Sequence, residues 1–181
     1  MRLIKPYHYS EMNSKVALTE MVPESIMFGL RKLCVAVPER SSASAIDPLV
    51  IATFRCAVDL FEARDGWRME QLFDRLQLIP EFLNTPMILS AYANMIEVGS
   101  CLGCIVAYTT FLTHACARRA RAGTAIDDAY LDLVITSLDY TGIELDWQEV
   151  CRLLDVFREQ AMTDGYEEVC RKFLGSTNNQ P

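Results

Sequence analysis

The sequence predicts an all-α fold, and three observations support this class. Apolar residues recur at the three- and four-residue spacing of amphipathic helices through most of the chain. Prolines preceded by N-cap residues mark the starts of two helices, and no segment shows the period-two alternation of a β-strand. The chain has 181 residues, the size of one domain that buries roughly 70% of the surface its unfolded form exposes. We expect one helical domain over residues 1–175 and a polar C-terminal tail over residues 176–181.

Proline marks the helix starts in the first half of the chain. Asp47-Pro48 and Thr85-Pro86 each place an N-cap acceptor directly before a proline at the first helical position. The apolar stripe after Pro48 ends near Gly66, and a shorter stripe follows it, so two separate helices are expected there. The helices expected in this half cover residues 26–34, 48–66, 69–76 and 86–99, with a serine-rich loop at 39–45.

The helix expected over residues 98–117 is apolar all round and carries no charged residue. Its length fits a membrane span, and its uniform apolarity fits the buried centre of a helical bundle. Polar residues such as Thr109 and His114 dilute it, and the amphipathic helices around it need a shared apolar partner, which favours the buried centre. Gly123 separates it from a helix that begins with Asp127 and Asp128, and Asp146 is an expected N-cap. The remaining helices are expected at 128–138, 147–154 and 166–173.

Composition and charge exclude several classes of function. The chain has 17 Lys and Arg against 24 Asp and Glu, a net charge of -7, which argues against a nucleic-acid partner because that affinity comes from clustered cations. The N-terminus lacks the apolar run of a signal peptide, so we expect a cytoplasmic protein whose seven cysteines are thiols. Cys101 and Cys104 form a C-x-x-C without a preceding strand, which disfavours a redox role, and the paired spacing of a zinc site is missing.

No motif of an enzyme is present, so the expectation is a protein without catalytic activity or cofactor. His114 on an apolar helix is more typical of a packed or interface residue than of a general base. Asp59, Glu62 and Asp65 lie near arginines, the ordinary pattern of a solvated helix face. The pattern that remains, an apolar helix ringed by amphipathic ones, is typical of a module that binds a partner helix in a groove.

Three segments, in this order, resemble homology regions of the Bcl-2 family of apoptosis regulators. FRCAVDLFEARDGWRMEQLFDRLQL, residues 54–78, resembles the third region, with Phe54, Ala57, Asp59 and Phe61 at its apolar, small and acidic positions. NMIEVGSCLGCIVAYTTF, residues 94–111, is similar to the first region, and the segment from Asp146-Trp147 to residue 154 is similar to the second. The resemblance implies a helical bundle around the central apolar helix.

The function that the resemblance implies is pro-survival: amphipathic helices of pro-apoptotic family members would be sequestered in a hydrophobic surface groove. It further implies a cytoplasmic protein that associates with mitochondria. The polar C-terminal tail predicts no stable membrane anchor, a divergence from the family that suggests a viral origin. The groove would be lined by Phe61, Arg64, Met69, Leu72, Leu76, Met95, Gly103, Cys104, Val106, Ala107 and Phe111.

The chain departs from the family at the residue that would pair with the ligand's Asp. The family's Asn-Trp-Gly-Arg is replaced by Cys101-Leu102-Gly103-Cys104, so the expected cation is missing and Arg64 is the candidate substitute. Two alternatives therefore stay open. One is the same fold acting through another face, in homodimerisation or in blocking inflammatory signalling, and the other is a pore-forming, pro-death member.

Overall fold

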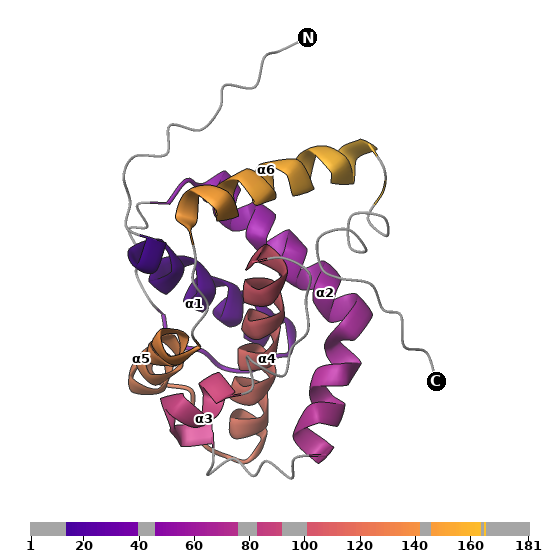
Figure 1. Cartoon of the computed structure of the whole chain (residues 1–181). Coiled ribbons are helices and arrows are strands. Elements are labelled where there is room, and N and C mark those ends of the chain that lie inside the picture. Colours follow the sequence, from indigo (N-terminus) through magenta and orange to yellow (C-terminus); the bar gives the residue numbers. More distant parts are fainter. Residues whose placement is uncertain are drawn as a thin grey trace.

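The computed structural model describes residues 14–39, 46–75, 83–91, 101–141, 146–163 and 165, and the regular structure of these residues is helical (Figure 1). The helices are α1 (Ser14–Lys32), α2 (Pro48–Arg75), α3 (Pro86–Ala91), α4 (Cys101–Arg121), α5 (Asp128–Ser137), a short 3-10 helix (Leu138–Tyr140) and α6 (Trp147–Thr163). The all-α class is confirmed. The helix expected at 166–173, the tail at 176–181 and the segment 92–99 lie outside the described residues.

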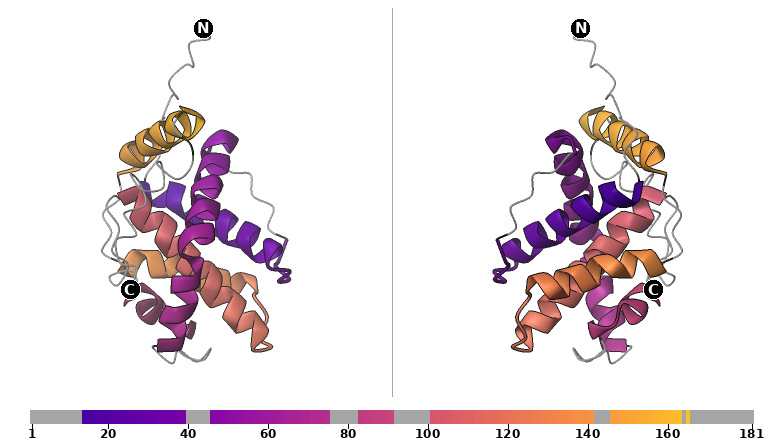
Figure 2. Two further views of the ribbon diagram at one scale, coloured as in Figure 1. Left: turned by 90° about the vertical axis from the view of Figure 1, so that its right-hand side faces the viewer. Right: turned by 90° about the vertical axis from the view of Figure 1, so that its left-hand side faces the viewer.

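Helix α4 is the centre of the bundle, with α1, α2 and α6 packed against it (Figures 1 and 2). Every side chain described between Leu102 and Ala117 is buried except the half-buried Cys104. The hydroxyls of Thr109, Thr110 and Thr113 donate to carbonyl oxygens one turn earlier, so these polar side chains are satisfied within the helix. The prediction of a buried central helix is confirmed, and no helix of the described chain has the length and apolarity needed to cross a membrane.

The aspartates predicted to start helices do so by accepting backbone hydrogen bonds. Asp127 Oδ1 accepts from Tyr130 N at 2.8 Å, and Asp146 Oδ1 accepts from Gln148 N at 2.9 Å. Asp47 Oδ1 accepts from the backbone N of the second residue of α2 at 2.8 Å. Each bond satisfies one of the N–H groups that a helix leaves unpaired in its first turn, which is why these boundaries could be predicted.

The prediction of two helices separated at Gly66 is wrong, because α2 runs unbroken from Pro48 to Arg75. Gly66 is buried within it, and the apolar residues on either side, Phe61 and Met69, are 4% and 5% exposed. A glycine costs a helix interior only about 1 kcal/mol relative to alanine, and burial of a continuous apolar face against α4 offsets that cost.

Helix α1 begins twelve residues before the range expected from the sequence, 26–34, and it contains Pro23. The proline lacks an N–H and removes one bond of the helix, but the residues before it, Ala17, Met21 and Val22, are fully buried. The helix ends at Lys32, and Cys34 then adopts a left-handed backbone with φ of 57° while its N–H binds the Arg31 carbonyl. Burial of apolar side chains in the bundle therefore stabilises α1 as a continuous helix even though it contains Pro23.

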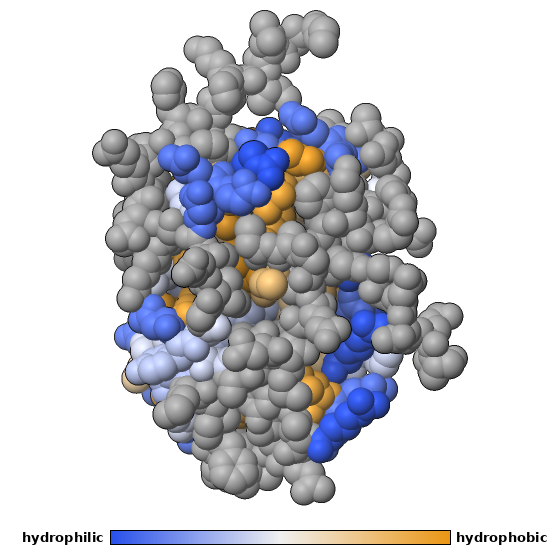
Figure 3. Space-filling view, in the orientation of Figure 1, coloured by the Kyte–Doolittle hydropathy of each residue, from blue (hydrophilic) through white to orange (hydrophobic). Residues whose placement is uncertain are grey.

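Polar side chains cover much of the described surface in the face that Figure 3 presents, and apolar residues are visible in the recesses between them. The large hydrophobic residues that are exposed among the described residues are Leu33, Leu49, Trp67 and Tyr140. Leu49 and Trp67 lie 18 residues apart on α2, about 27 Å along the helix, while Leu33 follows α1 and Tyr140 ends the 3-10 helix.

Candidate functional site

The groove residues suggested by the resemblance lie on α2 and α4, which pack directly against each other. Arg64, Leu72 and Cys104 are half-buried, and these have surface that a ligand can contact in this structure. Leu76 and Met95 lie outside the described residues. The buried members are Phe61, Met69, Gly103, Val106, Ala107 and Phe111.

Among the buried members, Phe111 packs directly against α2. The Phe73 and Phe111 rings stack with centroids 4.9 Å apart, and Tyr108 lies 6.0 Å from Phe111 on the same helix. Val106 and Ala107 are fully buried beside them in the sequence of α4. A ligand could reach these side chains only by parting α2 from α4 or by approaching over the half-buried residues.

Arg64, the candidate cation for a ligand's carboxylate, is already bound to a carboxylate of its own helix. Its Nε donates to Asp65 Oδ2 at 2.5 Å, and Arg68 approaches the other oxygen of Asp65 at 3.5 Å. The interpretation of Asp65 as part of a solvated face is wrong, because it is 3% exposed. Burial there is tolerated because two guanidinium groups face the carboxylate. A ligand's carboxylate would have to share Arg64 with Asp65.

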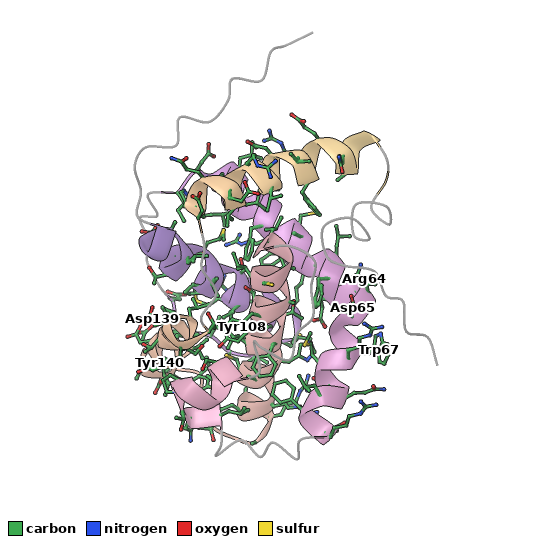
Figure 4. The ribbon with its side chains drawn as sticks, in the orientation of Figure 1. Arg64, Asp65, Trp67, Tyr108, Asp139 and Tyr140 are labelled. Carbon is green, nitrogen blue, oxygen red and sulfur yellow. The ribbon has the colours of Figure 1, made fainter. Side chains whose placement is uncertain are left out.

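An aromatic residue stands on the outer surface beside this pair, as Figure 4 shows for Arg64, Asp65 and Trp67. Trp67 is 53% exposed, and its indole N–H donates to the Arg64 carbonyl at 3.1 Å. The Arg68 guanidinium lies 5.3 Å from the centre of the indole ring. Tryptophan and arginine are the residue types most enriched in binding hot spots, although the sequence reasoning did not single out Trp67.

The C-x-x-C begins α4. Cys104 is a half-buried thiol, and the side chain of Cys101 is outside the described part of the structure. Burial raises the pKa of another thiol on α4, Cys116, to about 12, which makes that residue unreactive at neutral pH. Within the described residues no group of three or more His, Cys, Asp or Glu side chains could hold a metal ion.

The structure adds a charged cluster at the α2–α4 interface that the sequence reasoning missed. His114 is 6% exposed, and each of its ring nitrogens meets a glutamate of α2. Nε2 lies 2.8 and 3.0 Å from the two carboxylate oxygens of Glu62, and Nδ1 lies 2.5 Å from Glu70 Oε1. The expectation that His114 is a packed interface residue fits this geometry. The interpretation of Glu62 as part of a solvated face did not include its contact with His114 of α4.

Arginines of α4 extend the cluster by one further turn. Arg118 donates from Nε and Nη2 to Glu70 Oε2 at 3.1 and 2.7 Å, and from Nη2 to Asp74 Oδ1 at 2.7 Å. Arg121 approaches Glu70 at 3.7 Å. The Arg118 guanidinium also covers the Phe73 ring at 5.0 Å, so the charged cluster caps the aromatic stack of the core.

The cluster shifts the ionisation of its members in opposite directions. Burial disfavours the charged form of His114, but hydrogen bonds and charges from Glu62 and Glu70 outweigh it, and the pKa of His114 is raised. Burial also opposes ionisation of Glu70, but His114 and Arg118 outweigh it, and the pKa of Glu70 is lowered. The charged forms of both residues are therefore favoured in the folded protein.

A periodic signal in the sequence marks the two halves of this cluster but does not pair them. Glu62, Gly66, Glu70 and Asp74 recur every fourth residue on α2, and His114, Arg118 and Arg121 recur every three or four residues on α4. An acidic stripe on one helix and a basic stripe on another predict an interhelical contact only when the two helices are known to be neighbours. The partners here are 44 and 52 residues apart in the chain.

A pocket of about 690 Å³ lies at a different place, where the chain leaving α1 meets the α4–α5 connection. Residues 33–38 line one side, and Ala120, Arg121 and residues 123–128 line the other. None of the expected groove residues takes part, so this hollow is separate from the region that the resemblance assigns to a ligand. Comparison with known proteins adds no relative: no protein-family model, curated protein sequence or solved structure matches the chain.

Proposed function

We propose that this chain is a pro-survival regulator of apoptosis similar to the Bcl-2 family, and that it sequesters amphipathic death-promoting helices. The observation that carries the proposal is α4, a helix buried on all sides and enclosed by helices that contain the other two segments of the resemblance. A bundle organised in this way can offer a partner helix an apolar site between its outer helices.

The burial of the segment that resembles a death-promoting helix favours sequestration over a pro-death role. Phe54, Ala57 and Phe61, the apolar anchors of this segment, are 0%, 0% and 4% exposed. Asp59 points away from the core and binds Lys32 of α1 at 2.7 Å. A segment held in this way is not free to enter the groove of another protein, whereas the bundle around it can still receive a helix.

In this proposal the ligand helix approaches over the half-buried Arg64, Leu72 and Cys104. Its conserved acidic residue would compete with Asp65 for Arg64, because no arginine stands at position 104. Leaving one member of a buried ion pair without its partner costs about 2–5 kcal/mol. We therefore expect weak binding to a narrow set of ligands.

Calorimetric titration of the purified chain with a panel of death-promoting helical peptides tests the proposal. We expect at least one peptide to bind with micromolar affinity, and Cys104→Arg to tighten the binding of that peptide roughly tenfold, about 1.4 kcal/mol. Cys34→Arg is the matched control, because it adds the same charge at an exposed position on the α1 side of the bundle. Failure of every peptide to bind at micromolar concentration would overturn the proposal.

A second candidate function is an interaction module that uses another face, and the pocket between residues 33–38 and 123–128 favours it. Its wall includes Leu33, which is 42% exposed, and the aliphatic residues that follow it. Light scattering distinguishes a homodimer, at twice 20.5 kDa, from a monomer. Leu33→Ser would dissociate a dimer formed through this face and leave peptide binding over Cys104 unchanged.

A further inference from the structure

We propose that Glu62, His114 and Glu70 form a proton-controlled latch that fastens the C-terminal half of α2 to α4. The latch goes beyond the proposed function, because it requires neither a groove nor a ligand. It is built from one buried imidazole of α4 and two carboxylates of α2, all on described helices.

The number of protons on the imidazole decides whether the latch is closed. A neutral histidine has one N–H and can donate to one acceptor, whereas the imidazolium donates from both nitrogens. Both nitrogens of His114 face carboxylate oxygens, at 2.8 Å to Glu62 and 2.5 Å to Glu70. Loss of one proton turns a lone pair toward a carboxylate, so one of these bonds is replaced by repulsion.

Glu62 is the end of the latch that opens. Glu70 is also bound by Arg118 at 2.7 Å and approached by Arg121 at 3.7 Å, so it keeps cations when His114 is neutral. Among the described residues, the carboxylate of Glu62 has His114 as its one cationic partner. Glu62 is also 42% exposed at its side chain, so the released carboxylate can turn to solvent.

The other charged groups around the interface are engaged elsewhere. On α2, Asp74 binds Arg118. On α1, Gly29 lies against Thr113, the residue before His114. Ion pairs of α1 and α6 include Glu24–Arg55, Lys32–Asp59, Glu149–Arg152 and Asp155–Arg158. The proton on His114 is therefore controlled by the two glutamates and by the arginines of α4.

The lack of a side chain at Gly66 leaves room for the carboxylate of Glu62 beside α2. The Glu62 side chain folds along α2 toward α4, and a Cβ at position 66 would overlap its carboxylate. This accounts for a buried glycine in the middle of a continuous helix. Gly66→Ala should displace Glu62 from His114 without removing any ionisable group, which makes it a selective probe of the latch.

The first test is an NMR titration of the imidazole. The full chain contains two histidines, His8 and His114, so His8→Gln leaves one imidazole signal to follow. In this background we expect a pKa of His114 above the ordinary 6.5. Glu62→Gln and Gly66→Ala should each lower the pKa of His114. A pKa at or below 6.5, or one that neither variant changes, would overturn the latch.

The second test measures opening of the helix itself. Hydrogen exchange of the α2 amides over residues 62–74, corrected for the intrinsic pH dependence of exchange, reports how often α2 leaves α4. We expect opening to rise with pH through the pKa of His114, by about tenfold for each unit that this pKa exceeds its unfolded value. Glu62→Gln, which keeps the exposed end of the latch polar, should remove most of this rise.

Asp59→Asn is the matched control for hydrogen exchange. It removes the negative charge that α2 presents to Lys32 of α1, outside the latch, and should leave the pH-dependent rise intact. The same rise in Glu62→Gln as in the parent protein would show that another group controls opening. Peptide binding over Cys104 can fail in the calorimetric panel without affecting either measurement, so the latch and the proposed function are tested separately.

Discussion

At the scale of single residues, buried polar groups decide the local stability of the bundle. Tyr108 is 1% exposed in the centre of α4, and its hydroxyl lies 2.8 Å from Ser137 Oγ of α5. Ser137 in turn donates to the Val134 carbonyl at 2.5 Å, so the serine hydrogen is used within α5 and the tyrosine supplies the proton between them. Burial accordingly raises the pKa of Tyr108.

Ser137→Ala should lower the free energy of unfolding by about 1–3 kcal/mol, because it leaves the buried Tyr108 hydroxyl without its acceptor. Tyr108→Phe removes the hydroxyl together with its need for a partner and should cost less than Ser137→Ala. Urea unfolding of the two single variants and the double variant measures the coupling. Equal and additive losses would show that the hydroxyls do not bind each other.

At the scale of the elements, local sequence signals located the helix starts that an aspartate caps, but they missed the start of α1 and the continuity of α2. Asp127 and Asp146 could be predicted because a cap depends on backbone groups within three residues. Pro23 and Gly66 misled the prediction because their local cost is offset by burial against helices that are distant in the sequence. The charged contacts of His114 could not be predicted for the same reason, since they require the register of α2 against α4.

Gly29 of α1 and Gly66 of α2 differ in what surrounds them, and this difference gives a prediction. A Cβ at Gly29 would meet Thr113 Cγ2 at 2.9 Å, and Thr113 is held in place by its bond to the Thr109 carbonyl. Overpacking costs about 1–3 kcal/mol, whereas alanine gains about 1 kcal/mol of helix propensity. We expect Gly29→Ala to destabilise the protein by about 1 kcal/mol in urea unfolding.

Gly66→Ala is the matched comparison for Gly29→Ala, because the group it meets is the flexible end of Glu62. The carboxylate can turn aside, so the propensity gain offsets much of the lost bond to His114. We expect Gly66→Ala to be the less destabilising of the two substitutions. The reverse order would mean that α1 and α4 can separate at Gly29 at little cost.

At the scale of the whole molecule, the sequence predicted the class and the buried centre but not which surfaces are open. The central position of α4 could be predicted because the helix is apolar on all sides, and a helix of this kind is stable only when it is buried. The groove was transferred residue by residue, and Phe61, Val106 and Phe111 are buried in this structure. Whether a side chain lines a groove or fills a core depends on the separation of two helices, which composition and spacing do not encode.

The α2–α4 interface also predicts how global stability depends on pH. The pKa of His114 is raised, so its contribution is complete below the unfolded value of 6.5 and is lost as the pH rises through the folded pKa. The pKa of Glu70 is lowered, so its contribution is present above 4.5 and is lost as the pH falls through its folded pKa. The interface should therefore contribute most between about pH 4.5 and 6.5.

Comparison with His114→Gln isolates this contribution from the other ionisable groups of an acidic chain. The difference in unfolding free energy between the parent protein and His114→Gln should be largest near pH 6 and should shrink as the pH rises through the pKa of His114. Urea midpoints measured from pH 3 to pH 9, with the urea dependence of the free energy unchanged between the two proteins, give this difference directly. The loss of the Glu70 contribution to stability at acidic pH should persist in His114→Gln, because Arg118 still binds Glu70 in this variant. A difference independent of pH would mean that His114 acts through packing alone, since a group that keeps one protonation state across the range cannot make stability depend on pH.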